Sequence, residues 1–278
     1  MVMHLPMPNY DNVALVAQVV AERQNGGNRA FFNGIAQEWA QRVQQYLDSA
    51  GSPATVPEWP AVQTRRPTLL NLYAAPKNWV QAPILKTLRD NDLILCPACG
   101  EPGHPNTLDH YLPKGKYPHF CITPANLFPM CDACQQAKDE KTGDAATPRF
   151  FIHPYYDVFV ANQVLHLEIS EPFNEPGFQF AAANGLSAGD AALVMAHVRE
   201  LEIAQRYGSF FSGFYRRLLR NVAAMRAANL DVQSSLEASR VGAAHPTVNG
   251  WEHLFYDAVL NTPALMIYLT TAQLPPYL

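Results

Sequence analysis

The sequence has few charged residues and no long apolar run. Only 16% of its 278 residues are Asp, Glu, Lys or Arg, and the formal net charge is −4. A protein with this charge is not coated in nucleic acid, so a polyanion would have to meet a local basic surface. No apolar run reaches the roughly 18 residues that a membrane span requires, and the N-terminus lacks the basic-then-apolar pattern of a signal peptide. We therefore expect a cytoplasmic protein.

Cysteine is also scarce, and its spacing is informative. Four of the five cysteines form two CxxC pairs, Cys96/Cys99 and Cys131/Cys134. Each pair predicts a tight turn that lets two thiolates reach one tetrahedral zinc ion, and reduced thiols agree with the cytoplasm. A redox CxxC is the alternative, but neither pair opens a helix after a strand, as a thioredoxin-like site requires. Cys121 lies outside the pattern and is expected to be a buried apolar residue.

The segment between the two CxxC pairs carries residues suited to phosphodiester hydrolysis. Asp109 and His110 are adjacent, near the end of an expected short strand. A carboxylate can hold a hard cation such as magnesium, and a neutral imidazole can take a proton from water near pH 7. Lys114, Lys116 and Lys138 follow, where they could meet phosphate oxygens. For each lysine the alternative is an ordinary solvated side chain.

Several motifs in a fixed order resemble the zinc-bound HNH nucleases of the His-Me finger group. Within Cys96–Lys141 they read CxxC, DHYLPK, KYPHF, PANLFPMC and a second CxxC followed by Lys. The resemblance implies that His110 activates water, that Asp109 binds a catalytic magnesium or manganese ion, and that Asn126 fixes the loop that carries His110. A 5′-phosphate product is implied as well.

One position departs from that family pattern. The residue after the second CxxC pair is normally His or Asn and completes the catalytic metal site, whereas this chain has Gln135. An amide oxygen can bind a hard cation, but the Gln side chain is longer. One alternative is ligation by Asp132 or Asp139. Another is a catalytically silent zinc module that binds nucleic acid or a protein partner.

A second resemblance concerns the biological setting. DHYLPK and the HPYYD segment at His153–Asp157 are similar to parts of HNH proteins from bacterial anti-phage systems such as Septu. This similarity implies antiviral defence and a defence-system partner such as an ATPase. We expect DNA rather than RNA as the nucleic acid, and we expect His153 to be structural. The sequence shows no heptad pattern that would indicate a coiled coil. It leaves open whether the protein forms a homo-oligomer.

Helical patterns flank the motifs. Residues 12–49 carry one apolar stripe, divided at Asn25-Gly26-Gly27, and a proline-rich irregular wrap follows up to Pro83. Arg65-Arg66 in this wrap could contact phosphate, but we expect an ordinary solvated pair. A short helix and a strand at 93–95 should precede the first CxxC pair. After the motifs we expect short antiparallel strands at 149–153, 158–169 and 178–180, and then helices.

A second basic surface is expected on one of the C-terminal helices. Ile203–Leu230 contains no acidic residue, and Arg216 and Arg220 lie opposite its apolar face. These arginines are either solvated or bind the phosphates of a nucleic acid.

Together these patterns predict a mostly helical α+β fold. A small zinc-stapled ββα core at 93–157 should lie between a helical N-terminal region at 1–92 and a region at 158–278 with short strands and helices. The expected function is that of a metal-dependent HNH endonuclease that hydrolyses phosphodiester bonds.

Overall fold

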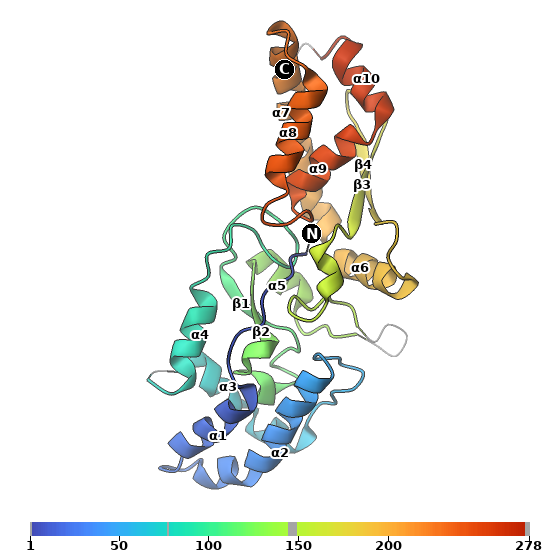
Figure 1. The fold of residues 1–278 in the computed structure, drawn as a ribbon. Helices are drawn as coiled ribbons and strands as arrows, with labels where there is room; N and C mark the ends of the chain where they lie inside the picture. The colour runs from blue at the N-terminus through green and yellow to red at the C-terminus, as the bar shows by residue number, and fades with distance from the viewer. Residues whose placement is uncertain (1, 77, 144–148, 276–278) are drawn as a thin grey trace. The chain divides into compact units, whose positions relative to one another are not determined.

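The chain is mostly helical, with two small antiparallel sheets (Figure 1). The computed structural model describes residues 2–76, 78–143 and 149–275. It confirms the expected α+β class. None of the helices it describes is long and apolar enough to cross a membrane.

The chain divides into two compact units. The motif unit comprises His4–Pro97 and Gly103–Val158, and the C-terminal unit comprises Met1–Met3, Ala98–Pro102 and Phe159–Leu278. The three regions expected from the sequence follow other boundaries and stay a prediction.

The motif unit begins with two helices that pack on each other. These are α1 (Asn12–Glu22) and α2 (Arg29–Asp48), separated at the expected Asn-Gly-Gly break. Asp11 caps α1, because its carboxylate accepts from the first free backbone N–H groups. The buried face of α2 includes Trp39, whose Nε1 donates to the carbonyl of His119 at 2.6 Å. This helix therefore supports the loop that follows Asp109 and His110.

The proline-rich segment is more regular than expected. It forms the 3₁₀ helix η1 (Pro60–Arg65), α3 (Arg66–Ala74) and α4 (Gln81–Arg89). Proline lies in the first positions of both η1 and α3, where a backbone N–H has no intrahelical partner to lose. The prolines thus start η1 and α3 instead of preventing helices, so the prediction of an irregular wrap was wrong there. Helix α4 is the short helix expected before the first CxxC pair.

Two strands and a helix follow the first CxxC pair. Strand β1 (Thr107–His110) pairs antiparallel with β2 (Leu127–Met130), with His110 opposite Leu127, and α5 (Asp132–Lys138) comes next (Figure 1). Two short 3₁₀ turns, η2 (Pro118–Phe120) and η3 (Pro124–Asn126), lie between the strands. The strand expected at 93–95 does not form. Leu95 makes only an isolated bridge, because the chain turns at the first CxxC pair directly afterwards.

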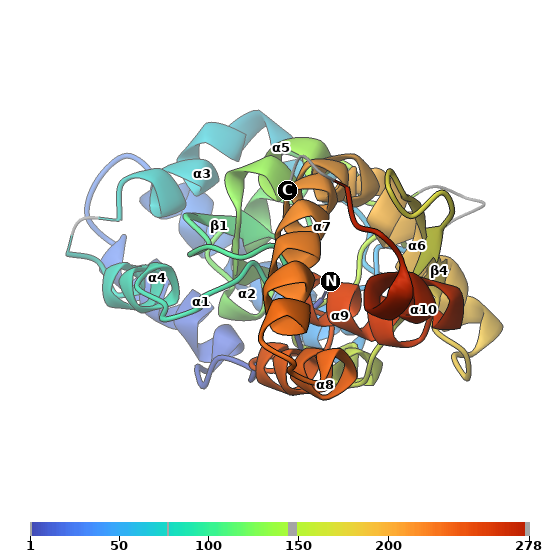
Figure 2. The same ribbon diagram turned by 90° about the horizontal axis from the view of Figure 1, so that it is seen from above.

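The C-terminal unit contains one hairpin and five helices. Strands β3 (Leu165–Ser170) and β4 (Gly177–Ala182) pair antiparallel. The short helix η4 (Val158–Ala161) replaces the start of the strand expected at 158–169, and residues 149–153 form no strand. The helices are α6 (Ala188–Glu200), α7 (Ile203–Ala227), α8 (Val232–Ala243), α9 (Trp251–Leu260) and α10 (Pro263–Thr271). Helix α10 packs against α7 and α9, and α9 packs against α8 and β3 (Figure 2).

His119 lies in the aromatic core of the motif unit. Its ring is fully buried, edge-on to Trp59 at 5.3 Å and against Phe120 at 4.0 Å. Neither ring nitrogen has a hydrogen-bond partner within the described residues. Burial lowers the pKa of His119 to about 3, with a smaller contribution from the Arg42 charge. The ring is therefore neutral near pH 7.

Acid should destabilise the protein through this histidine. Its usual pKa is about 6.5 in the unfolded chain, so the unfolded state takes up the proton first. The stability is fully present above pH 6.5 and falls by about 1.4 kcal/mol per pH unit as the pH drops towards 3. We expect His119→Phe to reduce this slope by about that amount in urea unfolding followed between pH 7.5 and 5. An unchanged slope would show that His119 does not contribute.

Candidate functional site

The four cysteines of the two CxxC pairs come together. Their sulfur atoms all lie within 4.8 Å of one another. Zn–S bonds of about 2.3 Å place the sulfurs of a tetrahedral site about 3.8 Å apart, so a small contraction fits the cluster to zinc. The backbone N–H of Cys131 donates to Sγ of Cys96 at 3.3 Å. The cysteines thus form a candidate zinc site.

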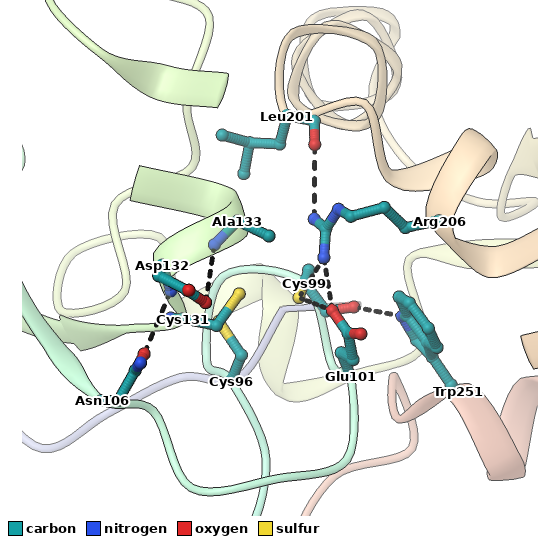
Figure 3. Close-up of polar contacts among 10 residues, drawn as sticks. All are labelled: Cys96, Cys99, Glu101, Asn106, Cys131, Asp132, Ala133, Leu201, Arg206 and Trp251. Atoms are coloured by element: carbon teal, nitrogen blue, oxygen red, sulfur yellow. Dashed lines mark hydrogen bonds and ion pairs between the residues drawn. The ribbon is translucent and has the colours of Figure 1, made fainter. Parts of the chain in front are cut away.

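Arg206 places a positive charge beside this cluster. Its Nη1 lies 3.7 Å from Sγ of Cys99 and also forms an ion pair with Glu101 (Figure 3). Trp251 donates from Nε1 to the carbonyl of Cys99 at 2.6 Å. A neighbouring cation favours the thiolate form that binds metal, and contacts around the ligands fix their orientation.

Cys121 is separate from the cluster, as expected. It is fully buried and its thiol donates to the carbonyl of Leu69 at 3.2 Å. Burial raises the pKa of Cys121 to about 12, so the sulfur stays protonated. It is therefore a structural residue.

Asp109 and His110 line a cleft of about 380 Å³ in the motif unit. His110 is 2% exposed, and its Nε2 is 2.9 Å from the carbonyl oxygen of Cys121. A carbonyl only accepts hydrogen bonds, so Nε2 carries the proton and Nδ1 keeps its lone pair. Burial lowers the pKa of His110 to about 4, although the charge of Asp109 opposes this shift. Above that pH the ring is a neutral base.

Asn126 holds the loop next to His110. This fully buried amide accepts from the backbone N–H of Leu112 at 2.7 Å and donates to the carbonyls of Leu112 and Phe120 at 3.1 and 3.3 Å. The side chain thereby bridges both ends of the loop that runs from Leu112, just after β1, to Phe120 in η2. This geometry agrees with the positioning role that the family resemblance implies.

Gln135 and Lys138 approach Asp109 from α5. Gln135 lines the cleft, and its amide nitrogen is 3.4 Å from Oδ1 of Asp109. Lys138 lies 3.1 Å from Oδ2 and donates to the carbonyl of His110 at 2.6 Å. We expected Lys138 to contact nucleic acid, but it is only 1% exposed. The structure places its ammonium inside the protein, because the last turn of α5 packs against the end of β1.

The residues around Asp109 fit a magnesium or manganese ion with few protein ligands. Oδ1 of Asp109 and the amide of Gln135 adjoin each other in the cleft, and turning the amide would present its oxygen. Mg²⁺ commonly takes one or two carboxylates and fills its other positions with water and phosphate oxygens. Asp139 lines the same cleft. Asp132 does not line this cleft. Its Oδ1 accepts from the N–H of Ala133 at the start of α5 (Figure 3).

The other predicted cations lie in different places. Lys114 lines the cleft, whereas Lys116 does not and is partly buried, with its carbonyl accepting from Gln63. Arg216 and Arg220 are exposed on α7 in the C-terminal unit and line two separate hollows there. In the motif unit, only Lys114 of the three predicted lysines lines the cleft, whereas Arg216 and Arg220 lie one helical turn apart on the exposed face of α7.

His153 is structural, as expected. Nδ1 accepts from the N–H of Tyr155 at 3.2 Å and Nε2 is 3.0 Å from the hydroxyl of Tyr46. Asp157 binds the N–H of His153 at 2.6 Å and forms an ion pair with Arg149 at 2.9 Å. The HPYYD segment is thus a closed hydrogen-bonded turn.

Sequence reasoning missed Arg66 as a cleft residue. Arg66 lines the cleft beside Asp109 and His110, although it belongs to α3, far from the motifs along the chain. The sequence left a phosphate contact for the Arg65-Arg66 pair as the less favoured alternative to a solvated pair, and it did not place either arginine in the cleft. No spacing rule links α3 to the motifs, so the pair gave no signal beyond its charge.

Part of the chain is similar to a phage protein. No protein-family model and no solved structure matches the chain. Among curated proteins, protein ea31 of Escherichia phage lambda is 30% identical over 115 residues. The match covers 40% of this chain and 39% of that protein, so the chain spans about two fifths of the length of this relative. The similarity relates one part of this chain to one part of a phage protein.

Proposed function

We propose that the chain is a metal-dependent HNH endonuclease that hydrolyses the phosphodiester bonds of DNA. The observation that carries the proposal is that Asp109, His110 and Gln135 line one cleft. Gln135 directly follows the second CxxC pair, which belongs to the four-cysteine cluster. The order of β1, β2 and α5 supports it, since the family motifs belong on two strands and a helix. On this proposal the three elements are a His-Me finger core.

His110 is the general base in this proposal. Its Nε2–H is held by the carbonyl of Cys121, so the lone pair on Nδ1 is the one that can take a proton from water. Asn126 fixes the loop that supplies that carbonyl. The developing hydroxide would attack the phosphorus in line with the leaving oxygen and release a 5′-phosphate.

Asp109 and Gln135 would hold the catalytic metal. When bound, a magnesium or manganese ion would neutralise charge on the phosphate and the leaving oxygen. The four cysteines would hold a separate zinc ion with a structural role, since a closed set of four thiolates leaves no position for water.

We further propose a role in conflict between bacteria and phages, with a defence-system partner such as an ATPase. The similarity of DHYLPK and HPYYD to anti-phage HNH proteins supports this setting.

A catalytically silent zinc module is the second candidate. The observation in its favour is the 3.1 Å ion pair between Lys138 and Asp109, which already neutralises the carboxylate. Such a module would bind nucleic acid or a protein partner without cutting, and the cleavage assays below separate the two functions.

We expect the purified protein to carry about one zinc ion per chain, because four thiolates complete a tetrahedral site. Cys96→Ser combined with Cys131→Ser should abolish zinc binding and lower the thermal stability, as measured by elemental analysis and a melting curve. Cys121→Ser is the matched control and should keep the zinc. Full zinc content and unchanged melting in the double variant would contradict the site.

His110→Ala should lower plasmid cleavage with magnesium by a hundredfold or more, since a general base typically contributes that much. His119→Phe removes another buried imidazole of the motif unit and should leave cleavage near the wild-type rate. Circular dichroism checks that both variants fold. If the His110 variant still cuts at the wild-type rate, the assignment of the base is wrong.

Gln135→Ala should raise the magnesium concentration needed for half-maximal cleavage, because it removes a ligand oxygen. Gln135→His and Gln135→Asn should keep or lower that concentration. Gln136→Ala is the control, since this neighbour lines the cleft without a recorded contact to Asp109. A shift with Asp139→Ala in place of Gln135→Ala would assign the ligand to Asp139.

A further inference from the structure

Arg66 brings a positive charge to the cleft from outside the motif stretch. It is the first residue of α3 and is exposed to solvent. Its Nη1 lies 3.4 Å from the carbonyl oxygen of Gly115, so the guanidinium rests on the loop that follows His110. The same cleft is lined by Asp109 and His110. A cation from α3 therefore lies on the wall of the proposed active site.

The preceding arginine is used differently. Arg65 donates to the side chain of Asn28 and stacks over the ring of Phe31 at 4.9 Å, so it is held against α2. It does not line the cleft. Arg65 and Arg66 thus differ in their access to the cleft.

Lys114 provides a second cation on the same wall. Its Nζ lies 5.7 Å from the ring centre of Tyr73, and this ring is edge-on to His110 at 4.7 Å. Lys114 and Arg66 both flank the loop at Gly115, on the side of the cleft that holds His110. A guanidinium matches the oxygens of a phosphate in two directions at once, and an ammonium adds a point charge.

Carboxylates line the same cleft as these cations. Asp139 and Glu140 line it directly after α5, and the carboxylate of Glu140 lies over Gly115, where a larger residue would collide with it. A phosphate would be repelled by these carboxylates and attracted by Arg66 and Lys114. A phosphate bound here would therefore have to lie closer to Arg66 and Lys114 than to the carboxylate of Glu140.

We propose that Arg66 and Lys114 form a subsite for a backbone phosphate next to the one presented to His110. This inference rests on the proposed nuclease function and specifies its substrate as a polynucleotide, since an isolated phosphodiester has no second phosphate to occupy the subsite. Phosphates recur along every nucleic-acid strand. Arg66 acts here as a binding residue and takes no part in proton transfer.

The test compares Arg66→Gln with Arg65→Gln. Binding of a fluorescent DNA oligonucleotide is measured by anisotropy at several salt concentrations, in buffer without magnesium or manganese so that the strand stays intact. We expect Arg66→Gln to weaken binding by about tenfold and to reduce the slope of log Kd against log salt by about one, as for the loss of one phosphate contact. Arg65→Gln should match the wild type.

Cleavage kinetics with magnesium supply a second measurement. Arg66→Gln should raise KM with little change in kcat, because it removes a binding contact and leaves His110 in place. Glu140→Gln should tighten binding, since it removes a repelling charge beside the subsite.

The outcomes separate the subsite from the function. If the wild type cuts DNA and the variants at Arg66 and Arg65 behave alike, the subsite is overturned while the nuclease stands. If the wild type neither binds nor cuts nucleic acid, the nuclease and its subsite are both overturned.

Discussion

The buried ammonium of Lys138 connects the elements on which the candidate site depends. It lies 3.1 Å from the carboxylate of Asp109 and donates to the carbonyl of His110 at 2.6 Å, which ties the last turn of α5 to the end of β1. Removing one partner of such a buried pair typically costs about 3–5 kcal/mol. The position of the Asp109–His110 pair therefore depends on a lysine whose side chain is itself buried.

Buried asparagines hold irregular chain in both units. Asn126 bridges the ends of the loop beside His110 in the motif unit. In the C-terminal unit, the side chain of Asn249 accepts from Val164 and donates to the carbonyls of Val160 and Asn162. Buried backbone groups in loops must find partners, and a side-chain amide can donate and accept together. These amides thus complete the hydrogen bonding of the chain after β1, before β2 and before β3.

The sequence predicted the parts that depend on local spacing. Two CxxC pairs place thiolates close together, and the apolar stripe of residues 12–49 with its Asn-Gly-Gly break predicts α1 and α2. The sequence could not predict that Lys138 is buried, because a lysine one turn after a CxxC pair has the same spacing whether its ammonium is buried or solvated. Arg66 was missed because only the tertiary packing of α3 brings it to the cleft. The strand expected at 149–153 failed for a similar reason, since Asp157 closes that segment into a turn.

Charge balance suggests how metal and substrate would bind on the proposed function. Asp109 and Lys138 cancel each other, so the ligand pair of Asp109 and Gln135 offers a divalent cation little net negative charge. A phosphodiester brings the missing negative charge and further oxygen ligands for a hard cation. Arg66 and Lys114 would hold that strand in the cleft without the metal. The ion would then bind most strongly once the strand is present, so that the substrate itself completes the metal site.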